Sequence, residues 1–144
     1  MIDIVPSERR STMMSGIRCR DTKPELAVRR YLHSAGFRFR LHRRDLPGSP
    51  DIVLIRYRVA IFVHGCFWHR HNNCKYAATP KTRADFWAAK FEANVRRDLD
   101  ARNELLQRQW RVALVWECSL RNSAEATFDS LRSFVLSLDK FQEL

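Results

Sequence analysis

Residues 64–74 bring three histidines, two cysteines, a phenylalanine and a tryptophan into one short segment. Cys66, His71 and Cys74 have the spacing Cys-x4-His-x2-Cys, and Cys118 is available as a fourth ligand from farther along the chain. Sulfur and imidazole donors in this number suit tetrahedral zinc, and four protein ligands leave no open position. The segment therefore predicts a structural zinc site; the alternative is one or two buried thiols beside surface histidines.

His64 and His69 remain for other chemistry. Residues 51–55 and 59–63 are short β-branched runs that predict a hairpin. A turn centred on residues 57–58 places Asp51 opposite His64, a turn centred on residues 56–57 places them diagonally on one face, and a three-residue turn separates their faces. In the first two registers a carboxylate and an imidazole converge, which is one way to hold Mg²⁺ and cleave a phosphodiester.

Several candidates also have interpretations without chemistry. Asp51 follows a proline and suits a turn, and Asp98 suits the solvated side of a helix. The aromatic residues Phe67, Trp68 and Trp87 can belong to the core. On a basic protein, however, adjacent exposed aromatic residues can wedge between base pairs.

The elements that must position these residues begin with a helix at Thr22, whose capping box is completed by Glu25 and which ends at Gly36. Residues 37–42 alternate apolar and basic types and predict a half-buried strand with one cationic face. The hairpin follows. A capping signal at Thr82 then predicts a long helix to about Gln109, with these residues buried: Phe91, Val95, Leu99 and Leu106.

Residues 111–116 predict one more strand, and Ser123 is the expected cap of a last helix. That helix is expected to bury Leu131, Phe134, Val135 and Leu138. The order is helix, three strands, helix, strand, helix, which indicates a mixed α/β domain with the long helix as a crossover. We predict an irregular, DNA-contacting arm over residues 1–21 and a single domain over residues 22–144.

The charge of the chain favours a polyanionic partner. The 144 residues carry 26 Lys and Arg against 16 Asp and Glu, a formal charge of +10. Residues 1–44 account for +7 of this excess, and nucleic acid is the favoured partner. No signal peptide and no apolar run of the ~20 residues needed for a membrane span is visible. A cytosolic location follows, where cysteines remain thiols or metal ligands.

Five runs resemble the very short patch repair (Vsr) mismatch endonucleases: LPGSPD at 46–51, FVHGCFWH at 62–69, FW at 86–87, NVRRD at 94–98 and WRV to VWEC at 110–118. The similarity extends from about Arg9 to Arg121. It implies a restriction-endonuclease-like core. It also implies a bacterial, cytoplasmic, nucleoid-associated monomer that nicks DNA with Mg²⁺ on the 5′ side of the thymine in a T·G mismatch, the product of 5-methylcytosine deamination.

The resemblance also implies residue roles. Asp51 and the carbonyl of Val63 would bind magnesium, His69 would be the general base, and His64 would assist at the phosphate. Glu25 and Asp98 would be outer-shell carboxylates. Zinc would lie on Cys66, His71, Cys74 and Cys118, while Phe67, Trp68 and Trp87 intercalate and Met14 enters from the opposite groove.

The sequence departs from the family pattern at Val63, which replaces a threonine, and near Arg70, where the histidine-rich segment is one residue longer. Two other functions remain open. One is a restriction-type endonuclease on the same core, and the other is a zinc-stabilised DNA-binding module without catalysis.

Overall fold

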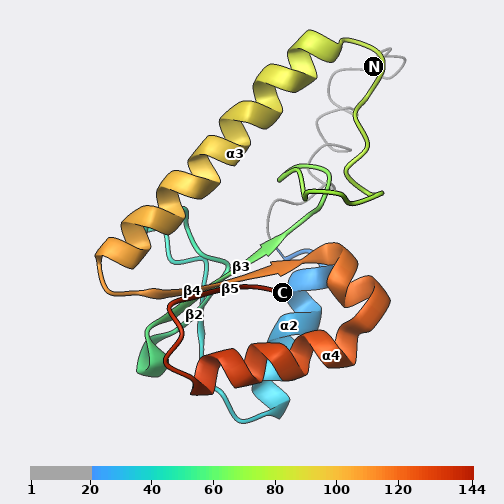
Figure 1. The fold of residues 1–144 in the computed structure, drawn as a ribbon. Coiled ribbons are helices and arrows are strands. Elements are labelled where there is room, and N and C mark those ends of the chain that lie inside the picture. The colour runs from blue at the N-terminus through green and yellow to red at the C-terminus, as the bar shows by residue number, and fades with distance from the viewer. Residues whose placement is uncertain (1–20) are drawn as a thin grey trace, which may run out of the picture.

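A computed structural model of the protein describes residues 21–144. The arm predicted over residues 1–21 lies outside the described residues, except for Asp21. Met14 belongs to this arm and therefore also lies outside them. Within that range, five strands form one sheet in the order β1-β2-β3-β4-β5, accompanied by three α-helices (Figure 1). The predicted mixed α/β class is confirmed.

In chain order the elements are α2 (Lys23–Ser34), β1 (Arg40–Leu41), β2 (Ile52–Leu54), the 3₁₀ turn η1 (Ile55–Tyr57), β3 (Val59–His64), α3 (Ala84–Gln107), β4 (Arg111–Trp116), α4 (Glu117–Leu136) and β5 (Phe141–Glu143). Strands β1, β2 and β3 pair antiparallel, whereas β3, β4 and β5 pair in parallel. Helix α3 therefore makes the predicted crossover from β3 to β4, and α4 makes a second crossover to β5. Strand β5 was not predicted, because three residues carry too short a pattern.

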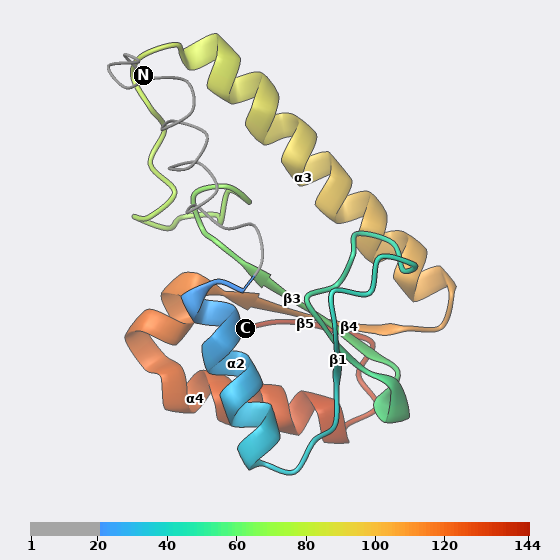
Figure 2. The same cartoon turned by 180° about the vertical axis from the view of Figure 1, so that it is seen from behind.

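The two faces of the sheet pack against different helices (Figures 1 and 2). Helices α2 and α4 lie side by side on one face, and α3 rises from the other. The larger core cluster fills the first face, from Val28 and Leu32 of α2 to Leu131 and Phe134 of α4. The alternate residues of β3 and β4 point to the α3 face, since side chains on a strand alternate between its two faces. His64 and Trp116, at the ends of these strands, belong to this second set.

The hairpin of β2 and β3 has the second of the two registers that were predicted to bring Asp51 and His64 together. Ile52 pairs with Ile61 and Leu54 with Val59, so the turn centres on residues 56–57. Arg58 has a left-handed conformation, with φ of 51°, and closes this turn. Strand β2 begins only at Ile52, so the pairing does not extend to Asp51, which directly precedes the strand.

Helix α3 differs from its prediction at its start and along its face. It begins at Ala84, and Arg83 rather than Thr82 occupies the cap position, without a side-chain hydrogen bond. Val95 and Leu99 are exposed to 42% and 43% instead of buried. The N-terminal part of α3 leads away from the sheet, so only its C-terminal part has the sheet to pack against (Figure 1).

Three smaller expectations were also corrected. Helix α4 starts at Glu117 and has a kink at Ser123, with φ of −150°, so a helical segment follows Ser123 as expected but an unpredicted segment precedes it. Leu138 lies beyond the end of α4 and is 95% exposed. Of the strand expected over residues 37–42, only Arg40–Leu41 pairs regularly, and both residues are exposed because β1 is an edge strand.

Candidate active site and metal cluster

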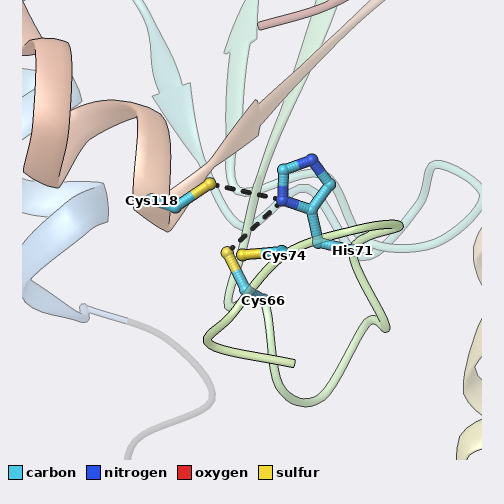
Figure 3. A group of neighbouring side chains, drawn as sticks. All are labelled: Cys66, His71, Cys74 and Cys118. Carbon is cyan, nitrogen blue, oxygen red and sulfur yellow. Dashed lines mark hydrogen bonds between the residues drawn. The ribbon is translucent and has the colours of Figure 1, made fainter. Parts of the chain in front are cut away.

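The predicted zinc ligands form one cluster between the loop after β3 and the start of α4 (Figure 3). Cys66, His71 and Cys74 come from the loop, and Cys118 comes from the first turn of α4. Each residue offers a ligand atom within 4.8 Å of those of the others. The Nδ1 atom of His71 lies 3.3 Å from the sulfur of Cys118 and 3.7 Å from the sulfur of Cys66. Three sulfurs and one imidazole nitrogen form a donor set that can hold a metal ion.

The electrostatics of the cluster fit a metal that displaces protons. Burial raises the pKa of the Cys66 thiol to about 12, and the neighbouring thiols also contribute. Burial also acts to raise the pKa of Cys74, but the N–H of Tyr76 and the other two thiols outweigh it and lower that pKa. A cation at the centre would favour the thiolate form of every cysteine, so metal binding and deprotonation are coupled.

His64 and His69 form a second group with Asp98 of α3. The Nδ1 atom of His69 lies 2.6 Å from Oδ2 of Asp98. The two imidazole rings stack with their centroids 3.7 Å apart and their planes 7° apart. Asp98 is therefore not a freely solvated helix residue, because its carboxylate orients a histidine from a loop 29 positions earlier.

The environment of His64 differs from that of His69. His64 is only 7% exposed, and its Nδ1 atom has no hydrogen-bond partner within residues 21–144. Burial lowers the pKa of His64 to about 3, and the neighbouring His69 adds to this effect. The imidazole of His64 is consequently neutral near pH 7. Both histidines and Asp98 line a cavity of about 360 Å³ between the sheet and α3.

Asp51 is the centre of a third group, on the side of the site nearest α2. Its Oδ2 atom accepts a hydrogen bond of 2.8 Å from the N–H of Val63. Burial raises the pKa of Asp51 to about 7; the Val63 N–H opposes this shift, and the carboxylate of Glu25 reinforces it. Two carboxylates held together in a half-buried place are a fitting site for a divalent cation with a preference for oxygen ligands.

The predicted convergence of Asp51 on His64 is thus indirect. No hydrogen bond joins these two described residues, and each has its own set of charged neighbours. The two groups meet through β3, since Val63 is bonded to Asp51 and is adjacent to His64. The charged residues that shift the pKa of Asp51 come from α2: Glu25 raises it and Arg29 lowers it.

Glu25 combines its predicted capping role with contacts that were not predicted. Its N–H donates to Oγ1 of Thr22 over 3.4 Å, and its Oε2 atom accepts from the N–H of Asp21 over 2.9 Å. The same oxygen accepts from Arg29 over 3.1 Å, and Nε2 of His42 lies 3.7 Å away. These groups converge on Oε2, and the same carboxylate helps to raise the pKa of Asp51.

The predicted wedge residues pack together at the base of the loop and the start of α3. Phe67 meets Trp68 edge to face at 5.0 Å and Trp87 at 5.8 Å, and Trp68 lies 5.8 Å from Trp87. All three are partly exposed. The side chain of Asn94 donates to the carbonyl of Trp68 over 3.2 Å and ties the loop to α3. The aromatic group lies at the surface rather than in the main core.

Sequence reasoning missed the residues that support the site from other elements. Arg29 was not predicted because its position on a helix is typical of a surface charge. His42 was not predicted because it belonged to the expected cationic strand. Trp116 and Glu143, which contact each other across β4 and β5, were missed because β5 itself was not predicted. The run VWEC was the one signal that could have singled out Trp116.

Comparison with known proteins places the chain in a family. The family model described as DNA mismatch endonuclease Vsr matches residues 2–75. The chain is 52% identical over 120 residues to the Type II nicking enzyme V.XorIIP of Xanthomonas oryzae pv. oryzae, covering 83% of this chain and 88% of that protein. It is 41% identical over 131 residues to the DNA mismatch endonuclease Vsr of Escherichia coli (strain K12), covering 91% and 83%.

A third relative, the Type II nicking enzyme V.NmeAIP of Neisseria meningitidis, is 42% identical over 124 residues, covering 86% of this chain and 88% of that protein. The class that these matches define is that of DNA endonucleases. The chain belongs to the Vsr family within that class, which confirms the resemblance and implies a restriction-endonuclease-like core. Between residues 21 and 144, no helix has the length and apolar character to cross a membrane.

Proposed function

We propose that the protein nicks one strand of double-stranded DNA on the 5′ side of the thymine in a T·G mismatch left by 5-methylcytosine deamination. The kinship with the mismatch endonuclease of Escherichia coli supports this substrate. The observation that carries the chemistry is the hydrogen-bonded pair of His69 and Asp98, with Asp51 bonded to the N–H of Val63 next to His64. The protein acts as a monomer, with residues 22–144 as one endonuclease domain.

Asp51 and the backbone carbonyl of Val63 would hold Mg²⁺, and Glu25 would orient water around it. A bound magnesium ion would neutralise phosphate charge and lower the pKa of a coordinated water. The role of Glu25 is consistent with its contacts, because Arg29 and the N–H of Asp21 hold its carboxylate in place and the carboxylate acts on Asp51. An aspartate and a glutamate are suitable donors, since Mg²⁺ prefers oxygen ligands.

His69 acts as the general base. Its Nδ1–H donates to Asp98, so Nε2 carries the lone pair and accepts a proton from the attacking water. Asp98 keeps this tautomer and stabilises the imidazolium that forms. The pair needs no other residue to define which nitrogen is basic.

His64 assists at the scissile phosphate as a neutral imidazole. Its depressed pKa excludes an imidazolium near neutral pH, so its contribution is a hydrogen bond rather than a full positive charge. Stacking against His69 keeps the two rings parallel. The neighbouring rings therefore present their nitrogens to one region of the substrate.

Zinc on Cys66, His71, Cys74 and Cys118 would fix the shape of the loop that carries His69. Phe67, Trp68 and Trp87 would enter the base stack beside the mismatch, and Met14, from the arm over residues 1–21, would enter from the opposite groove. A T·G pair is easier to unstack than a matched pair, so wedge insertion favours the mismatch. The basic surface supplies phosphate contacts that weaken with salt.

The decisive experiment is a nicking assay on strand-labelled duplexes. One duplex contains T·G and its control contains T·A, and each is incubated with and without Mg²⁺. We expect one nick, 5′ of the mismatched thymine, only with T·G and Mg²⁺. His69→Ala should abolish it, whereas the matched control His33→Ala, at the exposed end of α2, should not.

Two other functions give different results in this assay. A restriction-type endonuclease cuts both strands of matched DNA that carries its recognition sequence. A zinc-stabilised DNA-binding module binds duplex without cutting, and Asp51→Ala leaves its behaviour unchanged. Equal nicking of both duplexes, or of neither, is incompatible with mismatch repair as the function.

A further inference from the structure

Trp116 contacts one histidine from each of the two neighbouring groups. Its ring stacks on His71 of the cysteine and histidine cluster, with centroids 4.2 Å apart and planes 10° apart. It also meets the ring of His64 edge to face, at 5.4 Å and 73°. The indole is 6% exposed and ends strand β4. A single buried ring therefore limits the orientation of both imidazoles.

The orientation of Trp116 depends in turn on Glu143. The Nε1–H of the indole donates to Oε1 of Glu143 over 2.9 Å. Glu143 lies on β5, which pairs in parallel with β4 so that Leu114 is opposite Glu143. The backbone N–H of Trp116 also donates to the carbonyl of Leu144. A buried indole N–H needs an acceptor, and a carboxylate is a strong one.

His64 has a particular need for such support. His69 is oriented by its hydrogen bond to Asp98, but Nδ1 of His64 has no partner among residues 21–144. Among residues 21–144, the ring packs against His69 on its face, against Trp116 edge to face, and against the tilted ring of Phe62. A rotation of the Trp116 indole would remove its contacts with both the His64 ring and the His71 ring.

We propose that Glu143 is a positioning residue. By fixing the indole of Trp116, it sets the ring of His71 for metal binding and the ring of His64 for the phosphate. The part that concerns His64 rests on the proposed nicking function, whereas the part that concerns His71 and the cluster does not. Contacts behind a metal ligand commonly change metal affinity or activity by about 10- to 100-fold.

The test compares three substitutions of one residue. Glu143→Gln keeps an oxygen acceptor at the same reach, Glu143→Met keeps the length without a good acceptor, and Glu143→Asp keeps the charge but is one methylene shorter. We expect kcat on T·G duplex to fall about tenfold in Glu143→Met and Glu143→Asp, with KM within about twofold. Glu143→Gln should retain most of the activity.

Two readouts are independent of nicking. Co²⁺ titration of metal-free protein reports the cluster through its thiolate-to-cobalt absorption, and we expect about tenfold weaker binding in Glu143→Met and Glu143→Asp but not in Glu143→Gln. Nitrogen NMR shifts of the His64 and His71 rings should move in the same two variants. If Glu143→Met does not fold, the comparison of Glu143→Asp with Glu143→Gln still decides.

The outcomes separate this inference from the proposed function. Unchanged cobalt affinity and ring shifts in Glu143→Asp would overturn the positioning role even if the wild-type protein nicks T·G. Equal impairment of Glu143→Gln and Glu143→Asp would also overturn it, because the hydrogen-bond acceptor would not be what matters. If the wild-type protein fails to nick, the cobalt and NMR results still test the link from Glu143 to the cluster.

Discussion

His69 and Asp98 are joined by a hydrogen bond of 2.6 Å between Nδ1 and Oδ2, although 29 positions separate them in the chain. The bond connects the loop after β3 to the middle of α3. Both side chains remain about 30% exposed, so the pair is accessible to a substrate as well as to its neighbours. In this arrangement the Asp98 carboxylate keeps the proton of His69 on Nδ1, so Nε2 is the basic nitrogen of the ring.

Asp98→Asn should lower kcat by about 100-fold while DNA affinity stays within about twofold. The amide cannot stabilise the imidazolium, and it can present its NH₂ group to Nδ1 and select the wrong tautomer. Asp100→Asn, two positions along α3 and exposed, is the matched control. Single-turnover nicking and DNA-binding measurements check the pair, and equal activity of the two variants would count against a role for Asp98.

Asp51→Asn should change the pH dependence of stability. Burial raises the folded-state pKa of Asp51 to about 7, above its unfolded value near 4, so its contribution favours folding below about pH 4 and is lost as the pH rises through 7. The asparagine stays neutral and can still accept from Val63. Without Mg²⁺, it should be more stable than wild type above pH 7, by about 1–4 kcal/mol.

Denaturant unfolding of both proteins between pH 5 and pH 8 measures this difference, because carboxylates that do not interact with Asp51 contribute equally to both proteins. Mg²⁺ is omitted rather than chelated, so that any zinc remains bound. Added Mg²⁺ should stabilise wild type at pH 8 and leave Asp51→Asn unchanged. A pH-independent difference between the two proteins would contradict the raised pKa.

Cys118→Ser should release the metal of the cysteine and histidine cluster. Cys118 is the one ligand that comes from α4, so a metal here joins the start of α4 to the loop after β3. Elemental analysis should find one zinc per wild-type chain and much less in the variant. Tm should fall by about 10 °C, since ~3 kcal/mol corresponds to such a shift in a protein of this size.

Cys19→Ser is the control for this experiment, because Cys19 is the one cysteine of the sequence outside the proposed ligand set. A strong zinc chelator should lower the Tm of wild type and of Cys19→Ser but not that of Cys118→Ser. Zinc contents that are equal in the two variants would argue against the cluster as a metal site.

Arg111→Met should destabilise the fold without affecting the site directly. The guanidinium donates to these backbone carbonyls: Tyr57, Phe134, Val135, Ser137 and Asp139. Burial lowers the pKa of Arg111, but the group remains charged and joins β4 to the end of α4. Loss of all these bonds should cost about 3 kcal/mol in unfolding free energy.

Arg108→Met provides the comparison, since this exposed arginine forms a surface ion pair with Glu104. Its effect should stay within about 0.5 kcal/mol. Arg111→Lys should fall between wild type and Arg111→Met, because one ammonium cannot reach all the carbonyls. Urea unfolding curves distinguish the three variants.

Trp68→Ala should reduce discrimination between T·G and T·A more than it reduces binding to matched DNA. Stacking of a base on an aromatic ring is worth about 1–3 kcal/mol, so the preference for the mismatch should fall about tenfold or more. Phe86→Ala is the control, since Phe86 is exposed on α3 but is not a predicted wedge residue. Equal loss in both variants would indicate a general effect on the aromatic group.

The sequence determined the parts of this protein that depend on local spacing. Capping residues and periodicity predict the start of α2, the order of the main helices and strands, and the crossover through α3. A short Cys and His motif predicts three members of the cysteine and histidine cluster. Cys118 could also be predicted as the fourth member, because a residue just after β4 must lie at the same edge of the sheet as the end of β3. The family could also be named from its motifs.

Tertiary structure decided which of the possible interpretations applied. The sequence allowed Asp98 to be a solvated helix residue, and only the packing of α3 over the loop gave it His69 as a partner. The pattern of α3 predicted buried Val95 and Leu99, but periodicity defines an apolar face without saying whether another layer covers it. Glu143 and Trp116 meet because a three-residue strand adds to the sheet, a pairing whose free energy comes from the sheet rather than from the strand's own residues.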